Sequence, residues 1–422
     1  MHVRFVPSAA VVFGSLLILS GVTETAQARP VPVAGQARPA RTLLATLADP
    51  GDTYFDQFGY SVAISGSTAV VGAPGSTGWG EAYIFEKGPS GWSTTPAVTL
   101  QNPDGVPYFG NAVAVSGSTV VVGAYGISGS GDAPPGAAYI YVKGNDGWPT
   151  SPTASLPDPG ADNTDGFGWS VAVAGGEVVV GAPREDGGMG GTYVYVQNGG
   201  RWPTTPTAVL GDPTPTDVDD FGIAVSLAGR TLAVGADGTP GTAGPKASPG
   251  SAFLYVAGKG GWPTEPTVTL DDPLATDNDG YGSAVAISGR TLVVGARGAI
   301  GPDYPGAAYE YSETRKGWPT TPGAVLGRDP SEDLQHYFGY AIATNGRVAV
   351  VGAPGAYVGP TALYVYAERS GGWPTIPSVE TGDPDNAGYD GYGETLGMSG
   401  NTAIAGAWET NTDHGVAYLY RF

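Results

Sequence analysis

The chain has 422 residues, with 70 glycines, 37 prolines and no cysteine, and it carries a formal net charge of −20. The lack of cysteine excludes disulfides and thiol catalysis, and the negative charge disfavours nucleic acid and anionic membranes as partners. Hydrophobic residues make up 41% of the chain, which is too many for a disordered protein, so the glycines and prolines must separate the strands of a folded core.

The first residues predict an export signal. Arg4 supplies a positive charge, residues 9–22 form a short apolar stretch, and Ala26-Gln27-Ala28 offers a small-x-small cleavage site. The stretch contains Gly and Ser and is shorter than the ~20 apolar residues of a membrane span. We therefore expect a signal peptide at residues 1–28, a flexible segment at residues 29–42, secretion, and no membrane span after cleavage.

Seven copies of one unit follow. In each copy an aromatic residue and a glycine are followed by a Gly-Ala pair that starts 14 residues after the aromatic. The period of 51 to 60 residues is in the range of one propeller blade. The aromatic-Gly pairs begin at Phe58, Phe109, Phe167, Phe221, Tyr281, Phe338 and Tyr392, and the Gly-Ala pairs begin at Gly72, Gly123, Gly181, Gly235, Gly295, Gly352 and Gly406.

Each unit predicts four strands. Two short apolar strands, joined by a tight glycine turn such as Ser65-Gly66-Ser67, lie between the aromatic-Gly and Gly-Ala pairs. The third strand has two aromatic residues two positions apart, such as Tyr139 and Tyr141, and we expect these rings to pack against the next blade, with carbohydrate stacking as the alternative. The fourth strand follows a tryptophan corner such as Trp148-Pro149.

The last unit ends after its third strand, and a matching fourth strand stands near the other end of the chain. Residues 43–48 resemble the fourth strands of the other units, for example residues 207–211. Pairing the two ends would remove the open edges of a linear array. We therefore predict an all-β fold at residues 43–422, a seven-bladed β-propeller of four-stranded antiparallel blades, closed by its N-terminal strand. We expect a monomer.

These motifs resemble the FG-GAP repeat family, which forms the N-terminal propeller of integrin α subunits and occurs in many exported bacterial proteins. The resemblance covers residues 43–422 and implies a propeller with a binding or adhesion role outside the cell. In the integrin repeats, calcium loops lie between the aromatic-Gly and Gly-Ala motifs. Here that interval is a tight turn whose only acids are Glu177 and Glu394, so the integrin calcium sites do not carry over.

Most of the 39 acidic residues lie in two sets of loops, those before each aromatic-Gly pair and those after each Gly-Ala pair. Both sets should leave the same end of the blades and form one acidic face that attracts cations or basic ligands. Aspartates that precede proline are typical turn residues. A second group, nearer the aromatic, stands beside amides and glycines in a pattern that suits Ca²⁺. For this group calcium binding and plain turn chemistry both stay open: Asp162, Asp165, Asp217, Asp219, Asp277 and Asp279.

We predict no catalytic residues. His336 and His414 are isolated and are interpreted as surface residues, and the chain has none of the common nucleophile, metalloprotease or phosphate-loop motifs. We therefore expect a secreted, non-catalytic binding or adhesion module that uses the acidic face and Ca²⁺ to bind an extracellular protein or glycan. The alternative is an extracellular hydrolase or carbohydrate-binding protein that uses the carboxylates of that face.

Overall fold

The computed structural model describes the repeat region apart from several loops. The predicted signal peptide at residues 1–28 and most of the segment at residues 29–42 lie outside the described residues. No helix in the described part of the chain combines the length and the hydropathy that a membrane span requires. The described residues are 41–51, 56–75, 80–126, 134–161, 164–214, 219–238, 250–274, 279–298, 306–327, 337–355, 361–385, 390–409 and 414–422.

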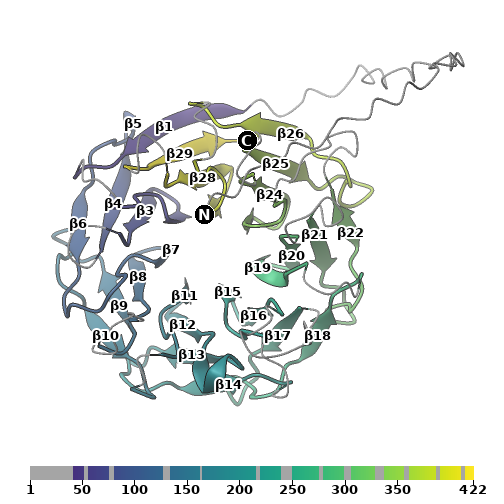
Figure 1. Ribbon diagram of the computed structural model, residues 1–422, viewed down its shortest axis with the longest axis horizontal. Coiled ribbons are helices and arrows are strands. Elements are labelled where there is room, and N and C mark those ends of the chain that lie inside the picture. The colour runs from purple at the N-terminus through teal and green to yellow at the C-terminus, as the bar shows by residue number, and fades with distance from the viewer. Residues whose placement is uncertain are drawn as a thin grey trace, which may run out of the picture. The chain divides into compact units, whose positions relative to one another are not determined.

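Seven antiparallel sheets stand around a ring, and each sheet is one blade (Figure 1). Blade 1 contains β2 (Ser61–Ser65), β3 (Thr68–Ala73), β4 (Glu81–Gly88) and β6 (Val98–Gln101), with the short β5 (Gly91–Trp92) paired to the end of β4. Blade 2 contains β7 (Ala112–Ser116), β8 (Thr119–Ala124), β9 (Ala137–Val142) and β10 (Ala154–Pro157). Blade 3 contains β11 (Ser170–Ala174), β12 (Glu177–Ala182), β13 (Gly191–Val196) and β14 (Ala208–Gly211), with the 3₁₀ turn η1 (Glu185–Gly187) between β12 and β13.

The remaining blades repeat this order. Blade 4 contains β15 (Ala224–Ala228), β16 (Thr231–Ala236), β17 (Ser251–Val256) and β18 (Val268–Asp271). Blade 5 contains β19 (Tyr281–Ser288), β20 (Thr291–Ala296), β21 (Ala307–Ser312) and β22 (Ala324–Leu326). Blade 6 contains β23 (Ile342–Thr344), β24 (Val348–Ala353), β25 (Ala362–Ala367) and β26 (Val379–Gly382). Blade 7 contains β27 (Leu396–Ser399), β28 (Thr402–Ala407), β29 (Val416–Arg421) and β1 (Thr42–Ala48).

The ring closes between the two ends of the repeat region. Strand β1 pairs antiparallel with β29, with Leu47 opposite Ala417, and supplies the outer strand of blade 7. Leu47 is fully buried, so the closing strand contributes to the core as well as to the hydrogen-bond ladder. The predicted seven-bladed propeller and its closure by the N-terminal strand are both confirmed. In every blade the first strand lies nearest the central channel and the fourth lies outermost (Figure 1).

Glycine contacts between neighbouring blades explain the two repeated motifs. Within blade 1, the N–H of Gly59 donates to the carbonyl oxygen of Gly72 at 3.1 Å, which fixes the spacing between the motifs. A Cβ added to Gly72 would lie 2.0 Å from the carbonyl oxygen of Gly110, the aromatic-Gly glycine of the next blade. All seven junctions have this contact at 2.0–2.2 Å, and Gly406 against Gly59 closes the ring. Any side chain at these positions would therefore separate two blades.

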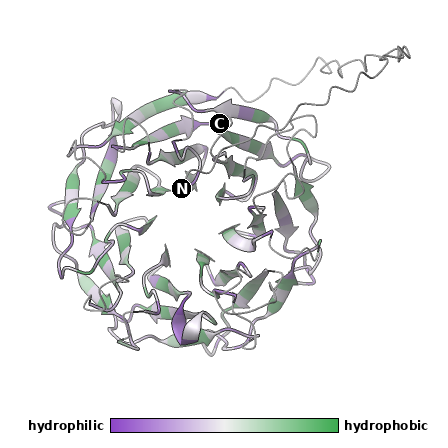
Figure 2. Cartoon of the chain, viewed as in Figure 1, coloured by the Kyte–Doolittle hydropathy of each residue, from purple (hydrophilic) through white to green (hydrophobic). Residues whose placement is uncertain are grey.

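The hydrophobic core lies between the blades rather than within one of them. Figure 2 shows hydrophobic residues along the strands all around the ring. Phe109, Tyr139 and Tyr141 of blade 2 pack against Val70 and Ile84 of blade 1. The prediction that the paired aromatics face the next blade was therefore wrong in direction, because they face the preceding one. The alternate residues of the third strand, which are aliphatic, face the next blade and meet its aromatic side chains.

One junction carries a buried acid in place of an aliphatic residue. Glu310 on β21 is only 2% exposed and occupies the strand position that Ile84, Leu254 and Leu419 hold in other blades. The Ser312 hydroxyl donates a hydrogen bond to its carboxylate, but burial dominates and raises the pKa of Glu310. The charged form of Glu310 therefore destabilises the junction between blades 5 and 6.

Gly406→Ala should destabilise the propeller by about 1–3 kcal/mol, because the new Cβ would press on the backbone at the closing junction. Gly211→Ala is the matched control, since a Cβ there meets nothing within 4 Å. Urea unfolding measures both variants. Equal stability losses in the two variants would contradict the proposed role of the glycine contact.

Glu310→Leu should raise the melting temperature, and the gain should grow with pH. Below the ordinary pKa of 4.5 the carboxyl is neutral in both the folded and the unfolded chain, so the gain is smallest there. Above that pH the Glu310 carboxyl ionises in the unfolded chain but stays protonated to a higher pH in the folded chain, so the stability of the wild type falls. Glu310→Gln, which removes the charge but keeps a polar group, should show the same trend. A gain that does not change with pH would refute this account.

Candidate binding face

The described parts of the two sets of acidic loops lie together at one end of the blades, as predicted. The N–H of Gly75, just after Gly-Ala-Pro, donates to the carbonyl oxygen of Asp56, two residues before the aromatic of the same blade, at 3.0 Å. The same bond joins Arg184 to Asp165 at 2.9 Å, and six blades have it among the described residues. We call this end of the ring, with both sets of loops, the acidic face.

Aspartates of the acidic face hold their loops by accepting backbone hydrogen bonds. The Asp158 carboxylate, before proline, accepts from the N–H of Gly160 at 2.8 Å, and its counterparts in four other blades make the same turn. The Asp165 carboxylate accepts from the N–H of Phe167 at 3.1 Å, and Asp279 accepts from Tyr281 at 3.0 Å. These aspartates therefore position the aromatic-Gly corner itself.

The structure places three of the six predicted calcium ligands. Asp165, Asp219 and Asp279 are all buried, each two residues before the aromatic of its blade. Within the described ranges no group of three or more Asp, Glu or His side chains is arranged to hold a metal ion. The other three predicted ligands, Asp162, Asp217 and Asp277, lie outside the described residues. The calcium site therefore stays a prediction.

Carboxyl groups come in pairs on this face. The aspartate before proline and the aspartate before the aromatic are seven residues apart, as in Asp49 and Asp56 or Asp158 and Asp165. Burial, and then the neighbouring Asp49 carboxyl, raise the pKa of Asp56 to about 8. Burial, with the charges of Asp158 and Glu185, raises the pKa of Asp165 to about 7. Each pair therefore resists carrying two negative charges.

The central channel opens on the acidic face in a hollow of about 370 Å³. Its lining includes, from every blade, the residue that directly follows the aromatic-Gly pair, which we call the mouth position. These positions differ in chemistry from blade to blade, whereas the glycines beside them are constant. The mouth residues of blades 1 to 7 are Tyr60, Asn111, Trp169, Ile223, Ser283, Tyr340 and Glu394.

Five aromatic rings lie near one another at this mouth, as a contacting pair and a contacting group of three. The ring of Trp408 meets Tyr60 edge-on at 5.7 Å between centroids, and Trp169 meets Tyr125 at 5.0 Å. Tyr108 stacks on Tyr125 at 4.5 Å between centroids, with an angle of 5° between the rings. Burial, and then the nearby Glu394 and Tyr108, raise the pKa of Tyr60. Among the described residues, the cores between the blades include none of these five rings. We call this group the aromatic arc.

Charged groups of both signs surround the mouth. The guanidinium of Arg184 lies 5.3 Å from the centre of the Trp169 ring, in a cation–π contact. Arg297 lines the hollow and donates to the buried Asp237 carboxylate at 3.1 Å. The indole N–H of Trp408 donates to Glu394 at 2.6 Å. The mouth therefore combines aromatic surface with charged groups that already have partners.

A comparison with models of known families matches the FG-GAP repeat at four segments, residues 44–85, 95–141, 151–195 and 262–311. These four segments are FG-GAP repeats. Each matched segment runs from the fourth strand of one blade to the third strand of the next, so the family unit has the same offset as the closing strand β1. The blades outside the matched segments have the same glycine contacts. A search of curated proteins found no match.

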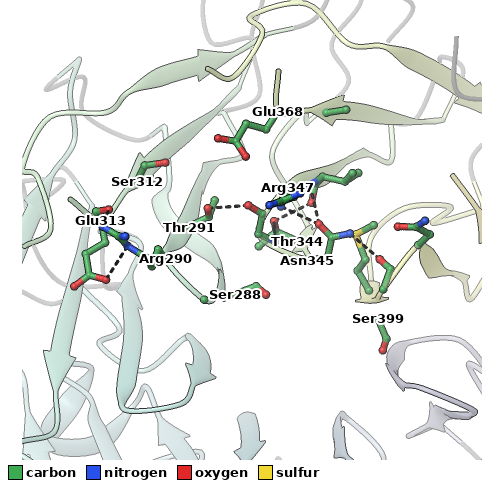
Figure 3. A pocket seen from close by; sticks show the side chains of 17 residues that line it. Ser288, Arg290, Thr291, Ser312, Glu313, Thr344, Asn345, Arg347, Glu368 and Ser399 are labelled. Carbon is green, nitrogen blue, oxygen red and sulfur yellow. Dashed lines mark hydrogen bonds and ion pairs between the residues drawn. The ribbon is translucent and has the colours of Figure 1, made fainter. Parts of the chain in front are cut away.

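A second hollow lies at the opposite end of the FG-GAP propeller, among the turns between first and second strands of blades 5 to 7 (Figure 3). Its volume is about 1110 Å³, and none of the described residues that line it is aromatic. Hydrogen bonds there join neighbouring turns, from Thr291 to the Gly346 carbonyl at 3.0 Å and from Asn345 to the Gly400 carbonyl at 2.7 Å. Its polar groups therefore fasten blades together.

Sequence reasoning missed the channel mouth. The residues of the mouth were visible only as the variable position after a constant aromatic-Gly pair, and no motif marks them. Their meeting at one hollow depends on the ring, which brings seven positions that are 51 to 60 residues apart in the sequence to a single axis. Variation at one position within an otherwise strict repeat is the signal that could have identified them.

Asp56→Asn should flatten the dependence of stability on pH. The pKa of Asp56 rises from its ordinary 3.8 to about 8 in the fold, so wild type is most stable below pH 4 and loses stability as the pH rises towards 8. An asparagine oxygen can still accept the N–H of Phe58 but cannot ionise. Melting temperatures between pH 5 and 9 should therefore converge, or the variant should become the more stable form, at high pH. Parallel curves for the two proteins would disprove this expectation.

Proposed function

We propose that the chain is a secreted, non-catalytic binding module that uses its acidic face to hold Ca²⁺ and to engage an extracellular protein or glycan. The observation that carries the proposal is the pairing of carboxyl groups in the loops of that face. In blades 1 and 3 an aspartate has a second carboxyl group beside it, and burial, with a smaller contribution from that neighbour, raises its pKa. A protein that maintains such pairs gains stability from a bound cation.

Calcium suits the chemistry of these loops better than a smaller cation. It accepts about six to eight oxygen ligands in flexible geometry, from carboxylates, amides and backbone carbonyls, whereas Mg²⁺ requires a tight octahedral shell. In the proposal Asp165, Asp219 and Asp279 supply carboxylates from the buried side of the loops. Asp162, Asp217 and Asp277 belong to the same proposed sites. A cation that binds only the folded state stabilises it in proportion to RT ln(1 + [L]/Kd).

Ca²⁺ should raise the melting temperature at fixed ionic strength, and Mg²⁺ should raise it less. The double variant Asp158→Asn and Asp165→Asn should reduce this response, because it removes the carboxyl pair of blade 3. Asp146→Asn is the matched control, since Asp146 is exposed in the turn that leads to the Trp148 corner, at the opposite end of the blades. Differential scanning calorimetry of the three proteins measures the effect.

Proton release provides an independent readout of the same binding. Because the pKa of Asp165 is about 7, Ca²⁺ bound at pH 7 should displace protons, and the heat of binding should depend on the ionisation enthalpy of the buffer. If NaCl at the same ionic strength stabilises the protein as much as Ca²⁺ does, the effect is screening. The carboxylates would then be turn residues only, and the calcium proposal would fail.

A further inference from the structure

At the channel mouth the seven blades are no longer equivalent. The blades share their glycine contacts, their strand order and their aromatic core residues, but the mouth positions carry Tyr, Asn, Trp, Ile, Ser, Tyr and Glu in turn. Packing of the ring does not require this variety, since the neighbouring positions repeat. A hollow lined by one side chain from each blade, of six different kinds, offers one asymmetric site for each chain.

Aromatic side chains dominate one wall of that hollow. Tyr60 and Trp169 line it directly, and each packs against a second ring of the aromatic arc, Trp408 and Tyr125 respectively. Tyr340 faces the hollow from blade 6. All three lining rings are partly exposed, whereas the tyrosines of the cores between the blades are buried. Exposed rings held in place by neighbours are typical of a binding surface.

The charges around the mouth select against ionic ligands. A cation that approached Trp169 would compete with the Arg184 guanidinium, which lies at its ring, and would also meet Arg297. An anion would have to cross the acidic face and then meet Glu394. The fitting ligand is therefore neutral, has an apolar surface for the rings, and has polar edges for the Glu394 carboxylate and the Asn111 amide oxygen. The amide N–H group of Asn111 already donates to the carbonyls of Gly168 and Trp169.

We propose that the channel mouth binds one neutral saccharide. A pyranose ring presents C–H groups, which carry slight positive charge, to the negative face of an aromatic ring, and its hydroxyls can bond to amide, carboxylate and guanidinium groups. The volume of about 370 Å³ is at the lower end of ligand sites and suits one or two sugar units. This site is separate from the paired aspartates of the acidic loops and does not depend on calcium binding there.

A neutral-glycan array, followed by calorimetry of the full chain with maltose, cellobiose and N,N′-diacetylchitobiose, tests the proposal. The measurements are made in EDTA, so that failure of the calcium proposal does not affect them. We expect binding of at least one neutral glycan, with one saccharide per chain. Trp169→Ala should weaken this binding about tenfold, because it removes one stacking ring.

Trp202→Ala is the matched control. It removes a partly exposed tryptophan from the corner of the same blade at the opposite end of the strands, and it should leave the affinity unchanged. Trp169→Phe and Tyr340→Leu guard against a folding defect, since the first should retain part of the affinity and the second should lose affinity with an unchanged melting temperature.

Three results would overturn the proposal. The first is no binding of any neutral glycan by the wild-type protein. The second is a stoichiometry of several saccharides per chain, which would place binding at repeated positions of the blades. The third is glycan binding that withstands both Trp169→Ala and Tyr340→Leu. Tetramethylammonium, used as a probe in the same calorimetry, should bind weakly or not at all, and tight binding lost in Trp169→Ala would assign the mouth to cations instead.

Discussion

The propeller depends on one contact, repeated seven times, between a glycine of one blade and a backbone carbonyl oxygen of the next. A Cβ at Gly72 would lie 2.0 Å from the Gly110 oxygen, so the two backbones approach as closely as their atoms allow. The Ser61 hydroxyl donates to the same oxygen at 2.7 Å and keeps it hydrogen-bonded. The aromatic residue before each such carbonyl then lies between the blades, where it fills the core. This close approach therefore sets the distance between neighbouring blades and places the aromatic residue in the core between them.

The same contact separates the residues of a blade that hold the fold from the residue that lines the channel mouth. The glycines and the aromatic residue have the same geometry in every blade, whereas the next residue lines the channel mouth and has different contacts in different blades. The mouth therefore varies in chemistry on a constant backbone, as Tyr60, Trp169 and Glu394 show at equivalent positions of three blades. In the acidic loops one residue has both roles. Asp56 and Asp165 each accept the backbone N–H of the aromatic residue, and each is also repelled by a neighbouring carboxylate.

Much of the fold could be predicted from the sequence because the same motifs recur seven times at a fixed spacing. The blade number, the strand order and the closing strand at residues 43–48 followed from fixed spacings. A third glycine escaped notice, the one before the third strand, although a Cβ at Gly80 would lie 1.9 Å from the Phe109 oxygen. The side of the blade that the aromatics face could not be read from a period of two, which gives both faces equally. Of the candidate site, the shared end of the acidic loops was predictable, but the mouth was not, because residues far apart in sequence meet there only in the closed ring.

The closing strand sets an order of events for the chain. Arg41, just before β1, donates to the Tyr420 hydroxyl at 3.3 Å across 379 residues, and β1 has its ladder partner only in β29. The first strand of the ring to leave the ribosome is therefore the last to be paired. Until β29 emerges, β1 has no partner and blade 1 has no preceding blade against Phe58. Contacts this distant in sequence slow folding. During that time the unpaired β1 and the uncovered apolar side of blade 1 could aggregate with other chains.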